Sequence, residues 1–183
     1  MPILQFSRRY SMAHRLILGT SEKCAIPHGH NEIVTVELEP LRALTLGEAN
    51  ALAPFEAVKG RWHAWIDGAV DHALQLNEAD PLVAYFLRHE PQRAERIMSF
   101  PGDPTTEAQA VLMFAKLQTF LAADGAPYRA ARLRVEETPT NAVVVEERTL
   151  AALDLPERGW FRRPDQSIND FAHPPKLAPP EWA

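Results

Sequence analysis

The feature that most constrains the fold is a two-residue period at the start of the chain. Between Leu4 and Leu18 the even positions are mostly large and apolar, whereas serine and arginine gather on the odd ones. Successive side chains of a strand point to opposite faces, so this alternation predicts a long β-strand. The segment His28 to Glu39 alternates in the same way after a loop at residues 19–27. Together the two segments predict an antiparallel pair.

The middle of the chain has helical spacing instead. Apolar residues recur three or four positions apart between Thr45 and Leu76, which predicts one or two helices, and Pro81 to Arg96 predicts another short one. A loop at residues 99–103 precedes a stronger helix. Asp103 followed by Pro104 is its expected start, because a carboxylate caps the first amides and proline suits the first helical position.

Two further alternating segments follow, Tyr128 to Glu136 and Asn141 to Glu147, and they predict a second pair of strands. The order is therefore ββααββ, with strands and helices in separate runs, which is typical of an α+β fold. We expect this domain to occupy residues 1–150. The remainder, 151–183, is a proline-rich C-terminal extension, and proline excludes regular structure, so it is either a docked arm or a loose tail.

Charge and composition exclude several classes of partner. Nineteen Lys and Arg against 24 Asp and Glu provide no positive field that would hold nucleic acid. No apolar run approaches the roughly 18 residues of a membrane span, so no membrane association is expected. Cys24 is the single cysteine, so it has no partner for an intramolecular disulfide. We therefore expect a cytoplasmic protein.

Three histidines have a spacing with geometric meaning. His28 and His30 are two residues apart, so their rings share one face of a strand, and His14 lies on the preceding strand. If the strands pair, these rings supply three nitrogen ligands to a tetrahedral zinc ion and leave the fourth position open for substrate or water. The alternative is a turn with exposed histidines and a half-buried His14.

The segments around these histidines resemble a known family. Met12-Ala13-His14-Arg15-Leu16 and Cys24-Ala25-Ile26-Pro27-His28-Gly29-His30-Asn31 are similar to the metal and nucleophile signature of the 6-pyruvoyl-tetrahydropterin synthase and 6-carboxytetrahydropterin synthase family. The three residues between Cys24 and His28 resemble the bacterial 6-carboxytetrahydropterin branch. The resemblance spans residues 3 to about 147. It also includes Val70-Asp71-His72, Leu76-Asn77, Pro104-Thr105-Thr106-Glu107 and Glu137-Thr138.

The resemblance implies a fold and a reaction. The family has the tunnelling fold (T-fold), an antiparallel four-stranded sheet with helices on one face, and this agrees with the predicted element order. Its subunits join their sheets into a barrel, so a homo-oligomer is expected, a hexamer as in the family, with sites between subunits. The implied activity is that of a zinc-dependent lyase. It converts 7,8-dihydroneopterin triphosphate to 6-carboxy-5,6,7,8-tetrahydropterin and releases acetaldehyde and triphosphate, in the pathway to 7-deazaguanines and queuosine.

The resemblance also implies the residues that move protons. Cys24 would be the base, since a thiol accepts a proton usefully where nearby positive charge favours its thiolate. Asp71 and His72 would form a dyad in which the carboxylate orients the imidazole. The alternatives are an inert thiol in a loop and a charged pair on the surface.

Substrate binding is implied for three more residues. Glu137 would hold the pterin, because a carboxylate accepts hydrogen bonds from the ring amide and the exocyclic amino group together. Thr105 and Thr106 would assist at the start of a helix. Alternatively, Glu137 is a solvated charge at a strand end, and the threonines only cap the helix.

Departures from the family pattern leave alternatives open. The segment 80–102 is longer than its counterpart, one extra residue separates His72 from Leu76, and Glu32 replaces a more usual aromatic residue. A 6-pyruvoyl product, acceptance of sepiapterin, and a non-catalytic pterin-binding protein all remain possible at this level. So does a hydrolase that uses zinc-bound hydroxide, although that chemistry has no need of Cys24.

Overall fold

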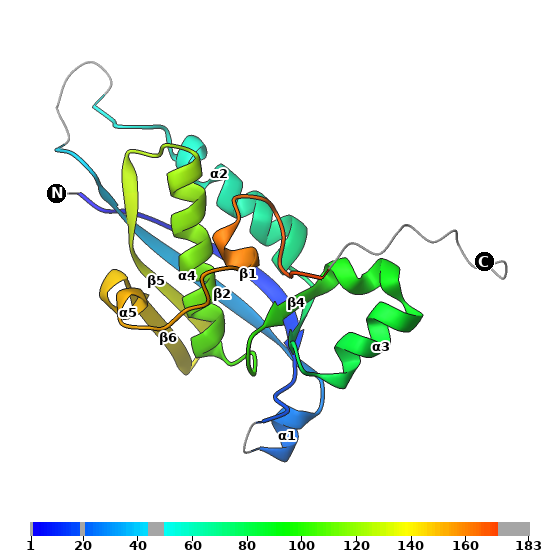
Figure 1. The fold of residues 1–183 in the computed structure, drawn as a ribbon. Helices are drawn as coiled ribbons and strands as arrows, with labels where there is room; N and C mark the ends of the chain where they lie inside the picture. The colour runs from blue at the N-terminus through cyan, green and yellow to red at the C-terminus, as the bar shows by residue number, and fades with distance from the viewer. Residues whose placement is uncertain (1, 19–20, 44–49, 172–183) are drawn as a thin grey trace.

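A computed structural model describes residues 2–18, 21–43 and 50–171. Its centre is a six-stranded sheet in the order β4-β3-β1-β2-β5-β6 (Figure 1). The strands are β1 (Leu4–His14), β2 (His28–Pro40), β3 (Ala73–Asn77), β4 (Ile97–Phe100), β5 (Tyr128–Thr138) and β6 (Asn141–Glu146). The four long alternating segments of the sequence are therefore β1, β2, β5 and β6, and they pair antiparallel.

The expectation of a four-stranded antiparallel sheet is wrong, because β3 and β4 extend it. β3 runs parallel to β1, with Met12 opposite Ala73 and His14 opposite Gln75, and β4 runs parallel to β3. Both additional strands are short, and most of their residues are buried whichever face of the sheet their side chains lie on. They consequently lack the alternation that marks a half-exposed strand, and a short apolar run resembles a helix turn equally well.

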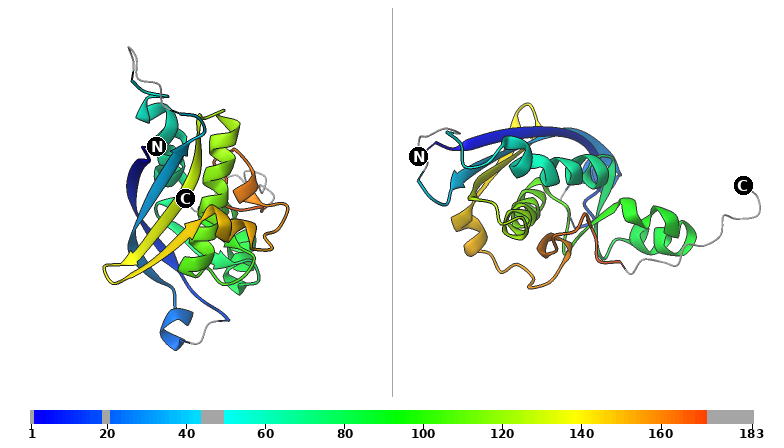
Figure 2. Two further views of the ribbon diagram at one scale, coloured as in Figure 1. Left: turned by 90° about the vertical axis from the view of Figure 1, so that its left-hand side faces the viewer. Right: turned by 90° about the horizontal axis from the view of Figure 1, so that it is seen from above.

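Helices cover one face of this sheet (Figure 2). The helical elements are α1 (Glu22–Ala25), α2 (Phe55–Trp65), η1 (Ile66–Val70), α3 (Pro81–His89), η2 (Pro91–Arg96), α4 (Thr106–Ala123), α5 (Glu147–Ala151) and η3 (Trp160–Arg162). The start expected at Thr45 lies outside the described residues. The helix expected through Leu76 ends much earlier, because the chain turns into β3. No helix in the described ranges combines the length and apolarity that a bilayer span requires.

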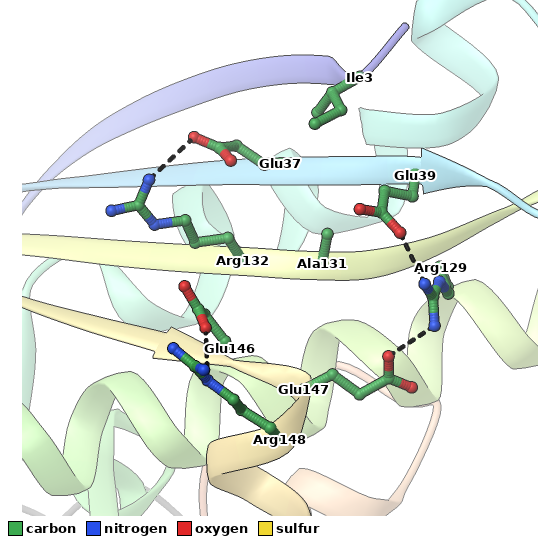
Figure 3. Close-up of a pocket in the computed structure, with 9 residues that line it drawn as sticks. All are labelled: Ile3, Glu37, Glu39, Arg129, Ala131, Arg132, Glu146, Glu147 and Arg148. Carbon is green, nitrogen blue, oxygen red and sulfur yellow. Dashed lines mark hydrogen bonds and ion pairs between the residues drawn. The ribbon is translucent and has the colours of Figure 1, made fainter. Parts of the chain in front are cut away.

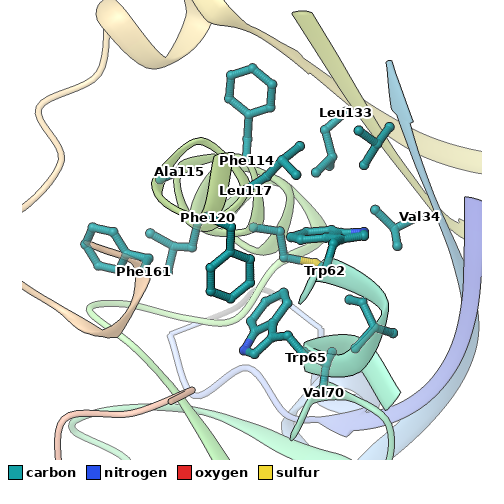
Figure 4. Packing of buried hydrophobic residues seen from close by; sticks show 14 of the residues in the cluster. Val34, Trp62, Trp65, Val70, Phe114, Ala115, Leu117, Phe120, Leu133 and Phe161 are labelled. Carbon is teal, nitrogen blue, oxygen red and sulfur yellow. The ribbon is translucent and has the colours of Figure 1, made fainter. Parts of the chain in front are cut away.

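The core lies between α2, α4 and the sheet (Figure 4). Trp62 and Trp65 of α2 pack at a tilt of 41° with ring centroids 5.1 Å apart, and Phe120 of α4 makes an edge contact with Trp65. Val34 and Leu133 close the layer from the sheet side and are fully buried. Aromatic residues of this size bury roughly 150–250 Å² each, so this layer is a main source of stability.

The start of α4 differs from the expected one. The cap is Thr105, whose hydroxyl accepts a hydrogen bond from the amide of Ala108 at 3.3 Å. Asp103 instead accepts from the backbone amide of Leu18 at 2.7 Å and from the side chain of Asn77 at 3.0 Å. Thr105 has the extended backbone of a cap residue, with φ of -73° and ψ of 161°, so the helix starts at Thr106. Asp103 thereby ties the end of β1 to the loop before α4.

The C-terminal extension is docked as far as Phe171. Trp160, Phe161 and Ile168 are buried in the core. The indole of Trp160 donates to the carbonyl of Ser99 at 2.8 Å, and the amide of Ser99 donates to the carbonyl of Ile168 at 3.0 Å. Up to Phe171 the extension is therefore a docked arm and not a loose tail. The proline pairs at 174–175 and 179–180 lie outside the described residues.

A buried lysine joins this arm to α4. The ammonium group of Lys116 donates to the carbonyls of Trp160 at 2.9 Å and Arg163 at 2.8 Å, and its side chain is fully buried. It also lies 5.0 Å from the ring centre of Phe120 and 5.8 Å from those of Trp65 and Trp160. Burial lowers the pKa of Lys116 from 10.5 to about 8.

Replacing this lysine should destabilise the protein in a pH-dependent way. Lys116→Met is expected to lower the free energy of unfolding by about 1–3 kcal/mol at pH 7, since two buried carbonyls lose their donor. Between pH 8 and 10.5 the unfolded chain binds more protons at Lys116 than the folded chain, so the contribution of this lysine to stability rises with pH. The difference in the free energy of unfolding between wild type and variant should therefore increase by up to about 3 kcal/mol over this pH range.

Urea unfolding at pH 7 and pH 10 measures this gap, with the exposed Lys23→Met as the matched control. Trypsin cleavage near Arg158 should also accelerate in the Lys116 variant as the arm loosens. A gap of the same size at both pH values would contradict this assignment.

Candidate metal centre and active site

Three histidine rings converge where the β1–β2 pair ends. In the register of the two strands His14 lies opposite His28, and Met12 lies opposite His30. One ring nitrogen from each histidine lies within 4.8 Å of the others, and His14 is 4% exposed. Gly29 is required between the two β2 histidines, because a Cβ there would approach the carbonyl oxygen of Met12 to 2.5 Å. The shared face expected for the three rings is present.

Hydrogen bonds orient two of the rings for metal binding. The Nδ1 atoms of His14 and His28 each lie 2.9 Å from a backbone carbonyl, that of Pro104 and that of Ile26 respectively. A carbonyl only accepts, so each Nδ1 carries the proton and each Nε2 presents a lone pair.

The distance between these lone pairs fits a metal ion. The two Nε2 atoms are 3.1 Å apart, where two lone pairs repel unless a cation lies between them. Nitrogen ligands of tetrahedral zinc are separated by about 3.3 Å, from Zn–N bonds of about 2.0–2.1 Å. Burial lowers the pKa of His14, which keeps its ring neutral and able to coordinate. The donor set therefore fits a zinc ion with an open coordination position.

The expected pterin-binding residues border this centre. The hydroxyl of Thr106 donates to Oε1 of Glu137 at 2.7 Å, and Glu137 is close enough to oppose the lowering of the His14 pKa. Thr106 is 9% exposed, and Glu137 is half-buried on β5. Thr105 serves as the cap of α4. The structure thus brings Glu137 and Thr106 to the edge of the histidine centre.

The sequence reasoning did not predict a buried carboxyl group on β2 that interacts with the charge of Glu137. Glu32 is fully buried on β2, and its Oε2 accepts from the side chain of Gln109 at 2.7 Å. Gln109 also donates to the hydroxyl of Tyr10 at 2.8 Å. Burial raises the pKa of Glu32, and the charge of Glu137 raises it further. The sequence did contain a signal for this burial. Glu32 lies an even number of positions from His28 and from His30, so its side chain lies on the same face of the strand.

Cys24 lies on the connection between the first two strands. It belongs to α1, which projects beyond the end of the sheet (Figure 1), and its side chain is half-buried. Its backbone carbonyl accepts from the amide of Leu16 at 2.8 Å, which holds α1 close to the end of β1. The thiol is not one of the atoms that converge within 4.8 Å. Cys24 is therefore a neighbour of the centre along the chain and not a further metal ligand.

Asp71 and His72 form the expected dyad, apart from the histidine centre. Nδ1 of His72 lies 2.9 Å from one Asp71 oxygen, and the other oxygen accepts from the amide of Ser11 at 2.7 Å. That amide is the main reason why the pKa of Asp71 is lowered. His72 is 77% exposed and has a positive φ of 63°. In the described part of the chain, no hydrogen bond or ion pair joins the dyad to His14, His28 or His30.

Comparison with known proteins identifies the relatives of this chain. A family model described as 6-pyruvoyl tetrahydropterin synthase matches residues 3–148. A 6-carboxy-5,6,7,8-tetrahydropterin synthase from Rickettsia bellii is 24% identical over 98 residues, which are 54% of this chain and 67% of that protein.

Solved structures share the fold at low sequence identity. An uncharacterized protein from Wolinella succinogenes has a TM-score of 0.62 and 19% identity, and the match covers 80% of this chain and 99% of that chain. The 6-pyruvoyl tetrahydropterin synthase from Plasmodium vivax has a TM-score of 0.52 and 15% identity, with coverages of 79% and 98%. The expected α+β tunnelling fold is thus confirmed, apart from the two added strands. Because the family model spans most of the sequence, the chain belongs to the 6-pyruvoyl tetrahydropterin synthase family.

Proposed function

We propose that the protein is a zinc-dependent lyase of the cytoplasm. It converts 7,8-dihydroneopterin triphosphate and one water molecule to 6-carboxy-5,6,7,8-tetrahydropterin, acetaldehyde and triphosphate, a step toward queuosine. The observation that carries the proposal is the convergence of three imidazoles, two with Nε2 atoms 3.1 Å apart, beside Glu137. The named relative from Rickettsia bellii supports the 6-carboxy branch. We assign the catalytic unit to residues 1–150 and the extension to 151–183.

Each residue of the proposed site has a chemical task. A zinc ion held by His14, His28 and His30 would act as a Lewis acid, which polarises substrate oxygens and acidifies the adjoining C–H groups. Cys24 removes one of these protons. His72, oriented by Asp71, carries the second proton, and the Ser11 amide keeps that carboxylate ionised.

Ring binding completes the assignment. Glu137 accepts hydrogen bonds from the amide and the amino group of the pterin, and Thr106 fixes the orientation of that carboxylate. Thr105 helps to shape the same edge by starting α4 there. A ring held by Glu137 would lie beside the metal centre, and the side chain of the substrate would then reach the histidines.

We further propose that sites are completed between subunits of a homo-oligomer, a hexamer as in the family. Cys24 and the histidines of one copy would then act with the Asp71–His72 dyad of another, which accounts for their separation within one chain. Strand edges are available for such an assembly. β6 is an edge strand, and on the side away from β2 the strand β1 is paired only at Met12–His14.

The reaction is tested by incubating the zinc-loaded protein with 7,8-dihydroneopterin triphosphate and analysing the pterins by mass spectrometry. The proposal expects 6-carboxy-5,6,7,8-tetrahydropterin together with acetaldehyde. A 6-pyruvoyl product would assign the other branch of the family. Tight binding with no turnover of this substrate or of sepiapterin would indicate a pterin-binding protein.

Replacing the ring anchor should weaken binding. Glu137→Gln is expected to reduce affinity for dihydroneopterin by about 1.5–3 kcal/mol, because a neutral amide replaces a charged acceptor of two hydrogen bonds. Isothermal titration measures the change. Glu136→Gln is the matched control, since Glu136 is the preceding residue on β5 and pairs with Arg134 at 2.5 Å. Equal affinities of the two variants would remove Glu137 from the ring site.

A further inference from the structure

A hollow of about 380 Å³ lies beside the dyad. His72 forms one side of it, and Arg93 and Arg96 of η2 also line it, together with Glu90. Leu74, Phe86 and Ile97 complete the lining with apolar surface. Most of these residues belong to the segment 80–102, which is longer than its counterpart in the family pattern. The hollow is therefore built largely from a part of the chain that the family resemblance left without a role.

The side chains that line this hollow carry more positive than negative charge. Arg93 pairs with Glu90, whereas among the described residues Arg96 donates to a neutral acceptor alone, the carbonyl of Gly68, at 3.0 Å. Arg96 also lies close enough to Asp71 to lower the pKa of that carboxyl group. Two guanidinium groups and an imidazole thus face one carboxylate in the lining. This excess is local, since the chain as a whole carries a net charge of -5.

A second hollow provides a contrast (Figure 3). Its three arginines are each paired with glutamate: Arg129 with Glu39 and Glu147, Arg132 with Glu37, and Arg148 with Glu146. Four carboxylates neutralise three guanidinium groups there, so an anion would find no uncompensated charge. The hollow beside His72 differs, because in the described part of the chain Arg96 forms no ion pair with a carboxylate.

We propose that the hollow beside His72 binds the triphosphate group of the substrate. This inference rests on the proposed function, in which His72 moves a proton on the substrate side chain. In 7,8-dihydroneopterin triphosphate the ester oxygen is two bonds from the nearer diol carbon, so the phosphates must lie close to whichever group acts there. Arginine matches phosphate oxygens with paired N–H donors, and Arg93 and Arg96 supply them.

The assignment has a mechanistic consequence. Triphosphate is the leaving group of the reaction, and guanidinium groups stabilise the negative charge that it retains when the carbon–oxygen bond breaks. Arg93 and Arg96 are therefore binding residues for the phosphates, and they hold the adjoining carbons next to His72. In an oligomer with shared sites, the same hollow would serve the histidine centre of a neighbouring copy.

Titration with sodium tripolyphosphate tests the hollow without requiring turnover. The zinc-loaded protein should bind tripolyphosphate, and Arg93→Gln with Arg96→Gln should weaken this binding about tenfold to a hundredfold, the range for lost hydrogen bonds to charged groups. Arg96→Lys should retain part of the affinity because it retains the charge. Arg88→Gln is the matched control, since Arg88 is an exposed arginine of α3 outside the lining. Affinity for dihydroneopterin, which has no phosphate, should not change.

The outcomes separate this inference from the proposed function. Tripolyphosphate binding that depends on Arg93 and Arg96, with no turnover of 7,8-dihydroneopterin triphosphate, would support the phosphate site and reject the lyase. Turnover with an unchanged KM in the double variant would keep the lyase and overturn the phosphate site. Equal tripolyphosphate affinity in the double variant and Arg88→Gln would also overturn it.

Discussion

A His28→Ala variant is expected to fold normally and to lose its zinc. With one imidazole of three removed, we expect the affinity for the metal to fall by more than the ten- to hundredfold typical of replacing a residue that hydrogen-bonds a metal ligand. The loss should be local, because the aromatic core around Trp62 and Phe120 is independent of the histidines. Metal analysis after dialysis against a chelator, together with circular dichroism, measures both parts of this prediction.

His89→Ala is the matched control for this experiment. His89 is exposed at the end of α3 and contacts Tyr85, with ring centroids 5.0 Å apart, so its removal should leave the metal content unchanged. Full zinc occupancy in folded His28→Ala would exclude the histidine centre as the metal site. Loss of metal from both variants would point to a general loss of structure, which circular dichroism would reveal.

A Cys24→Ala variant should retain zinc and pterin but lose turnover. Removal of a general base typically reduces the rate constant by about a hundredfold to ten-thousandfold. The thiol is not among the converging ligand atoms, so metal content should equal that of the wild type. Single-turnover measurement with 7,8-dihydroneopterin triphosphate separates this loss of chemistry from a change in binding. Near wild-type turnover would reject the lyase assignment and favour a hydrolase that uses metal-bound hydroxide.

Mixing variants tests whether the sites are shared. Cys24→Ala and His72→Ala should each be inactive alone. When they are co-assembled, an intersubunit site can receive an intact Cys24 from one copy and an intact His72 from another. Recovered activity in the mixture would support sites between subunits. An inactive mixture of proven hetero-oligomers would place both residues of each site in one chain.

Local sequence patterns predicted the elements whose structure depends on residues close together in the chain. The alternation around Leu4–His14 and His28–Pro40 identified a strand pair, because one face of each strand must be buried. The same parity put His28 and His30 on one face, and the family resemblance supplied the further site residues. All of these inferences depend on residues within one element or in adjacent elements.

Local sequence patterns predicted neither the short apolar strands nor the buried polar contacts. β3 and β4 are defined by their neighbours, since residues 73–77 and 97–100 have no alternation of their own. A lysine in a helix is usually exposed. Lys116 is buried, because the carbonyls of Trp160 and Arg163 accept hydrogen bonds from its ammonium group. Such a partner, more than forty residues away, is invisible to a local pattern.

Strand periodicity and motif spacing are properties of the chain alone, so they were enough to predict the four long strands, the histidine centre and the family. The grouping of the candidate residues depends instead on how the elements pack. The packing joins Glu137 to Thr106 beside the histidines, buries Glu32 on the same face of β2 as His28 and His30, and places His72 with Arg96 on a separate hollow. These groupings depend on the packing of β3, η2 and α4 against the sheet, which brings together residues that are distant in the chain.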